Sequence, residues 1–149
     1  MLLAILLLAG AVPLQSSSDA LYRDAVDALY SLDFARAEQR FEELRKEEPE
    51  DPHSWNRLAS VVWLELLYKQ QKLQLDRYAG DNAADRNSRS AIDPNTEARL
   101  RYFTSQAMNK AQIRLKVNPN DVDSLYSLGV TYGILASFEA TVNLSLIHI

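Results

Sequence analysis

Residues 21–55, LYRDAVDALYSLDFARAEQRFEELRKEEPEDPHSW, decide the fold of this chain of 149 residues. Apolar residues recur in this stretch at intervals of three and four, along residues 21–32 and again along residues 34–44. This spacing puts them on one face of a helix, so each run predicts an amphipathic helix. A short turn at residues 31–33 separates the runs, and Pro49 ends the second one. The stretch therefore predicts an antiparallel helical hairpin.

Further helices are expected where an aspartate is followed by a proline. The pairs Asp51-Pro52 and Asp93-Pro94 each supply an N-cap side chain and a proline suited to the first helical turn. The apolar pattern after Pro52 runs on to Tyr78, and a polar stretch then precedes Asp93. With 47% hydrophobic and 24% charged residues and few glycines and prolines, the composition is that of one folded all-α domain.

The hairpin resembles the tetratricopeptide repeat family, whose unit is two antiparallel helices with a period of about 34 residues. Ala25, Ala37 and Phe41 match the family's small and aromatic positions. The opening pattern of the unit returns twice, in residues Trp55, Leu58 and Ala59, and in residues Leu125, Leu128, Gly129 and Tyr132. The resemblance implies an all-α fold, a right-handed superhelical array of antiparallel helix hairpins (an α-solenoid).

The expected repeats differ in completeness. The first covers about 19–50 without interruption, whereas the second covers about 51–119 and is stretched by a long-helix insertion with a loop at 79–93. We weigh two interpretations of the insertion at 69–95, a role in binding and an ordinary tolerated insertion. A partial third repeat is expected over about 120–149, with its second helix beginning at Phe138.

The N-terminal residues 1–18 predict a leader. Their apolar run is too short to cross a bilayer, which takes about 20 residues, but it has the length of a signal-peptide core. Ala9 and Ala11 supply the small-x-small pattern of a cleavage site. We therefore expect a bacterial-type exported, periplasmic or otherwise extracytoplasmic protein. Because no basic residue precedes the run, an uncleaved anchor, a misassigned start and an ordinary buried helix remain alternatives.

The C-terminal residues 144–149 are apolar, whereas a solenoid normally closes with a polar outer face. Their sequence, LSLIHI, also resembles translated sequencing-adaptor read-through. We expect that the natural protein continues, that this chain is a C-terminally truncated fragment, and that its last residues are not native.

Residues with catalytic or metal-binding chemistry are scarce. The chain has no cysteine, and its two histidines, His53 and His148, have no carboxylate at ligand spacing. It contains neither a nucleophile elbow nor a glycine-rich phosphate loop. The formal net charge of -4 gives no support to a nucleic-acid partner. We expect no enzyme activity, no cofactor, no metal and no membrane span beyond an N-terminal anchor.

The remaining functional feature is a surface. The resemblance implies that the first helix of each hairpin lines a concave groove, with inward-facing positions at Tyr22, Arg23, Asn56, Arg57, Trp63 and Tyr126. Arg, Tyr and Trp often dominate binding energy in interfaces, although Trp63 has core packing as its alternative. The sequence thus predicts a non-catalytic scaffold that binds a protein or peptide partner in this groove. The alternative is an accessory N-terminal module of a longer protein whose activity lies downstream.

Overall fold

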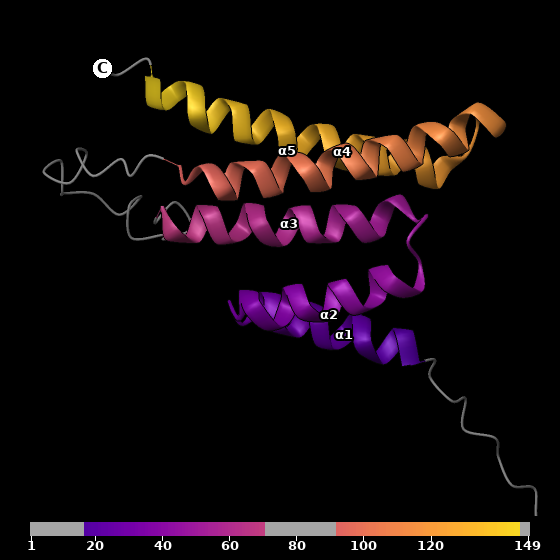
Figure 1. The fold of residues 1–149 in the computed structure, drawn as a ribbon, viewed down its shortest axis with the longest axis horizontal. Helices are drawn as coiled ribbons and strands as arrows, with labels where there is room; N and C mark the ends of the chain where they lie inside the picture. The colour runs from indigo at the N-terminus through magenta and orange to yellow at the C-terminus, as the bar shows by residue number, and fades with distance from the viewer. Residues whose placement is uncertain (1–16, 71–91, 147–149) are drawn as a thin grey trace, which may run out of the picture.

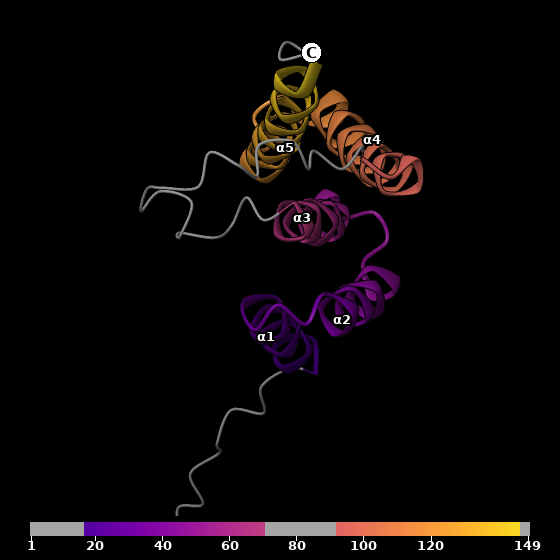
Figure 2. The same cartoon turned by 90° about the vertical axis from the view of Figure 1, so that its left-hand side faces the viewer.

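A computed structural model of the chain describes residues 17–70 and 92–146, and this part is all-helical, without a β-strand (Figure 1). The prediction of an all-α fold is confirmed. The helices are α1 (Ser17–Tyr30), α2 (Phe34–Glu47), α3 (Pro52–Lys69), α4 (Pro94–Val117) and α5 (Val122–Leu146). Each helix packs against the next, and α3 also contacts α5. Both views place α3 between the α1–α2 pair and the α4–α5 pair (Figures 1 and 2).

Local capping signals start three of these helices. The Asp51 carboxylate accepts a hydrogen bond from the His53 N–H at 3.2 Å, and Pro52 stands in the first turn of α3. Asp93 caps α4 in the same way, accepting from the backbone N–H groups of Asn95 and Thr96. Asp33 caps α2 through the Arg36 N–H at 3.2 Å. The predicted starts at Asp51 and Asp93 are confirmed.

The core lies where the helices cross. Five alanines are fully buried and allow close approach of the backbones, two in the α1–α2 hairpin and three in the α3–α4 hairpin: Ala25, Ala37, Ala59, Ala107 and Ala111. Large side chains fill the space between them, among them Phe41, Leu58, Leu100 and Phe138. The Trp55 ring of α3 meets the Phe103 and Tyr102 rings of α4 at centroid distances of 6.4 and 5.9 Å. The buried residues of both hairpins belong to one core cluster.

The fifth helix differs from its prediction in two respects. It runs without a break past Phe138, so the expected second helix of a third repeat is wrong. The residues before Phe138 (Leu135, Ala136 and Ser137) include no proline or glycine, and local helix propensity carries the helix through. Its buried face is formed by Ser124, Ser127, Thr131, Ile134 and Phe138, whereas Leu125 and Tyr132 of the predicted apolar stripe are 49% and 53% exposed.

Several predictions fall outside the described residues. These are the leader before residue 17, the loop of the insertion with the apolar residues up to Tyr78, and the last three residues of the chain. None of the helices in the described part combines the length and the apolar character needed to cross a membrane.

Candidate functional site: a groove between α1 and α3

A groove of about 430 Å³ opens between α1 and α3. Helices α1 and α3 both pack against α2, but they do not form an extensive contact with each other. The side chains that line the groove are mostly apolar and come from α1, the α1–α2 turn, α2 and α3: Tyr22, Val26, Leu29, Tyr30, Leu32, Phe34, Phe41, Arg57, Ser60 and Leu64. A concave, largely apolar surface with few polar groups is typical of a binding site.

Two of the predicted groove residues meet across this space. The Arg57 guanidinium of α3 lies over the Tyr22 ring of α1, 5.0 Å from the ring centroid. The Tyr22 ring in turn lies 6.3 Å from the Phe41 ring of α2, so a cation–π contact joins α3 to a pair of aromatic rings. Tyr22 and Arg57, which were both expected in a groove, therefore lie against each other.

Arg57 is the one cationic side chain among the residues that line the groove. None of the ion pairs within residues 17–70 and 92–146 involves it. A guanidinium stacked on a ring still presents N–H donors at its edge, and two of them match the spacing of a carboxylate. The groove therefore combines an apolar lining with a cation suited to an acidic group.

One end of the groove is formed by a strained turn. Leu32 has a positive φ of 61°, in the left-handed region that costs a residue with a Cβ about 1–2 kcal/mol. The Asp33 N–H closes the turn on the Ala28 carbonyl at 2.9 Å, and the Leu32 side chain stays 45% exposed. Tyr30 beside it is 86% exposed. A glycine at position 32 would avoid this strain, but the chain has a leucine there. The side chains of Tyr30 and Leu32 therefore both line the groove.

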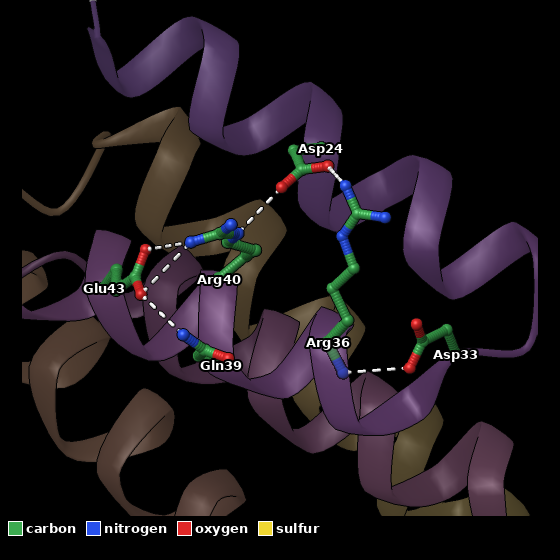
Figure 3. A network of polar contacts seen from close by, with 6 residues as sticks. All are labelled: Asp24, Asp33, Arg36, Gln39, Arg40 and Glu43. Atoms are coloured by element: carbon green, nitrogen blue, oxygen red, sulfur yellow. Dashed lines mark hydrogen bonds and ion pairs between the residues drawn. The ribbon is translucent and has the colours of Figure 1, made fainter.

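A polar network holds α1 against α2 (Figure 3). Asp24 of α1 accepts hydrogen bonds from Arg36 and, at 2.7 Å, from Arg40 of α2. Arg40 also pairs with Glu43 at 3.0 Å, and Gln39 donates to Glu43 at 3.1 Å. Partial desolvation raises the pKa of Asp24, but the bonds from Arg40 and Arg36 outweigh it and leave the pKa below its ordinary value. The network helps to fix the rotation of α1, and with it Tyr22 in the groove.

Asn56 lies elsewhere, and its predicted place in the groove is wrong. It is only 4% exposed, between α3 and α5. Its amide nitrogen donates to the Ser127 carbonyl at 2.9 Å and to the Ser127 hydroxyl at 2.8 Å. The Thr131 hydroxyl donates to the Asn56 amide oxygen at 2.8 Å. Both ends of the Asn56 amide bond to residues of α5, because a buried amide needs partners inside the protein.

The remaining predicted groove residues do not gather at the α1–α3 groove. Trp63 is half-buried, and its ring lies edge-on to the Phe138 ring of α5 at 6.3 Å, as its alternative of core packing implied. Tyr126 is 66% exposed on α5, with its ring 5.9 Å from that of His53. Arg23 is exposed on α1 and does not line the groove.

The candidate site expected from the sequence includes two of the ten residues that line the groove, Tyr22 and Arg57. Among the other eight, Leu32, Phe34 and Phe41 stand at no inward-facing position of the family pattern. The family pattern gives Phe41 a packing position, and Leu32 and Phe34 flank a turn where helical periodicity gives no direction for a side chain. The sequence offers one signal for this part of the groove, a leucine at position 32, where such a turn usually has glycine. In the described part of the chain no group of three or more His, Cys, Asp or Glu side chains is placed to hold a metal ion.

The chain matches no protein-family model, and no curated protein or solved structure is significantly similar to it. The resemblance to tetratricopeptide repeats therefore stays a prediction from the residues quoted above.

Proposed function

We propose that this protein is a non-catalytic interaction scaffold that binds a segment of a protein partner in the groove between α1 and α3. The observation that carries the proposal is the groove itself, with its apolar lining and Arg57 as its one cation. The segment presents an apolar side chain to Val26, Leu29 and Leu64 and a carboxylate to Arg57. Burial of the apolar group supplies affinity, and the ion pair fixes the orientation of the segment.

We further propose that the helices form a solenoid of the tetratricopeptide type. The two complete hairpins, α1–α2 and α3–α4, support this arrangement. Four of their fully buried alanines, Ala25 with Ala37 and Ala59 with Ala107, stand at positions that match the small residues of the family. In such an array the first helices of successive hairpins line the concave side, which is consistent with a groove between α1 and α3.

Panning of a random peptide library on the immobilised chain tests the binding function. The wild-type chain is expected to enrich peptides that carry an acidic residue next to apolar ones. Arg57→Glu should lose this enrichment, because it places a like charge against the peptide carboxylate. Lys116→Glu is the matched control, since it makes the same charge change at an exposed site of α4 outside the groove. Equal enrichment by wild type and Arg57→Glu would refute the site.

A further inference from the structure

The groove between α1 and α3 has two unlike ends. Near the N-terminal ends of both helices, the Arg57 guanidinium of α3 lies 5.0 Å from the centroid of the Tyr22 ring of α1. Near the C-terminal end of α3, the Tyr68 ring lies 5.7 Å from the ring of Phe34, which follows the α1–α2 turn. Helices α1 and α3 therefore run parallel, from right to left in Figure 1. The groove has its cation at the end where both helices begin.

The side chains that α1 and α3 contribute to the groove stand at matching levels. From the N-terminal end, the three levels are formed by Tyr22, Val26 and Leu29 on α1, and by Arg57, Ser60 and Leu64 on α3. Each run advances by seven positions, from 22 to 29 and from 57 to 64, which is about 10 Å at the rise of an α-helix. The levels therefore follow one another about once per helical turn.

We propose that the segment bound in this groove is an amphipathic helix of a protein partner, which we call the ligand helix. This inference rests on the function proposed above. One face of a helix presents side chains at i, i+3 or i+4, and i+7, which is the spacing of the three levels. In an extended segment, side chains on one face recur about every 6.7 Å, so the third lies about 13 Å along and passes the leucine level.

The lining of each level determines which side chain the ligand helix places there. At the first level, Arg57 carries the charge that pairs with an Asp or Glu of the ligand helix. At the second level, Val26 and Ser60 are short and leave room for a large apolar side chain. At the third level, Leu29 and Leu64 offer apolar surface to another one. The ligand helix therefore has an acidic residue at one end of an apolar stripe that is two turns long.

Three synthetic peptides, titrated against the full-length chain by fluorescence anisotropy, test this spacing. Each has about 16 residues on an alanine–glutamine background, with blocked termini so that one glutamate is its only acidic group. The helix-spaced peptide has this glutamate at i and leucines at i+4 and i+7. The strand-spaced peptide has its leucines at i+2 and i+4. The proline peptide is the helix-spaced one with proline at i+5, on the side away from the groove.

The helix-spaced peptide should bind most tightly. The strand-spaced peptide should bind at least about tenfold more weakly, because as a helix it reaches one apolar level fewer. The proline peptide should bind roughly 100-fold more weakly, because proline breaks the helix. Equal binding of either control peptide would overturn the ligand helix but leave the proposed function standing, provided that Arg57→Glu still abolishes binding. If no peptide binds, the proposed function falls as well, and residues of this chain or of a second copy fill the groove.

A shift of the cation by one level tests the match between the groove and the ligand helix. The shifted chain, Arg57→Leu with Ser60→Arg, should prefer a peptide with glutamate at i+4 and leucines at i and i+7. Ile113→Arg with Lys116→Leu is the matched control, because it moves a charge by three positions on the exposed side of α4, and it should keep the wild-type preference. A shifted chain that is folded by circular dichroism and still prefers the helix-spaced peptide would contradict the proposal.

Discussion

Helices α3 and α5 begin alike and end up in different surroundings. Asp51 and Asp121 both follow a proline-containing turn, and each carboxylate accepts the hydroxyl of a buried serine three residues on, Ser54 at 3.4 Å and Ser124 at 2.7 Å. Beyond this start, α3 packs against α2, α4 and α5, while α5 packs against α4 and α3. The difference shows that local sequence sets where a helix begins, whereas the number of neighbours decides which of its faces is buried.

The largest expected difference between the two helices concerns their leucines. Leu58→Ala removes a fully buried side chain of α3 and should lower the free energy of unfolding by about 3 kcal/mol, because it leaves a cavity. Leu125→Ala on α5 removes a side chain that is 49% exposed and should cost less than about 1 kcal/mol. Urea unfolding of dilute protein measures both values. Equal losses would show that the α5 face is covered as fully as that of α3.

The next effect concerns the contact between the two helices. Asn56→Ala leaves the Thr131 and Ser127 hydroxyls without their amide partner in the interior, and should cost about 2 kcal/mol. Asn109→Ala, at an exposed position of α4, should change stability by less than about 0.5 kcal/mol. Chemical unfolding of the two variants side by side gives the comparison. A cost at Asn56 no larger than that at Asn109 would contradict the buried network.

The third expected effect concerns a small residue of each helix, Gly129 of α5 and Ala59 of α3. Substitutions at these two positions should change the free energy of unfolding in opposite directions. Gly129→Ala should stabilise the single chain by about 1 kcal/mol, since alanine favours a helix and the added Cβ meets nothing within 4 Å. Ala59→Gly, at the matching position of α3, should destabilise it by about the same amount or more. Thermal unfolding of dilute protein measures the two shifts. A destabilising Gly129→Ala would mean that the outer side of α5 is already in contact.

The smallest expected effect concerns the Asp121 carboxylate at the start of α5. The hydrogen bond from Ser124, opposed by partial desolvation and aided by Arg114, holds the pKa of Asp121 below its ordinary value of 3.8. A lowered folded-state pKa contributes stability that is fully present above the ordinary value and is lost as the pH falls through the folded-state value. Asp121→Asn should therefore weaken the dependence of unfolding free energy on pH below 3.8. If the unfolding free energy of Asp121→Asn depends on pH below 3.8 as that of the wild type does, the pKa of Asp121 does not contribute to stability.

Sequence patterns predicted the helix starts well because their signals are local. The Asp-Pro pairs at positions 51 and 93 need no distant partner to cap a helix, and the buried alanines of the hairpins follow from their spacing. Asn56 was misplaced because its partner Ser127 lies 71 positions away, beyond any periodic pattern. The continuity of α5 departs from the repeat period, which predicts a turn before Phe138 although residues 135–137 include no proline or glycine.

The candidate site was predicted in part for the same reason. Tyr22 and Arg57 were both expected at inward-facing positions, and their side chains meet. Leu32 joins the groove through a positive φ in the α1–α2 turn, which helical periodicity does not describe. The Trp63 ring of α3 lies beside the Phe138 ring of α5, and the Tyr126 ring of α5 lies beside the His53 ring of α3. Both contacts depend on how the α3–α4 hairpin packs on α5.

An NMR titration of the isotope-labelled chain with a peptide enriched by panning tests the central claim most directly. The account predicts that amide shifts change around Tyr22, in the turn at Leu32 and around Arg57, and that Arg57→Glu removes them. Amide shifts on the outer side of α5 should stay unchanged at the dilution used. Shift changes concentrated on α5, or changes of equal size in the Arg57→Glu variant, would contradict a binding groove between α1 and α3.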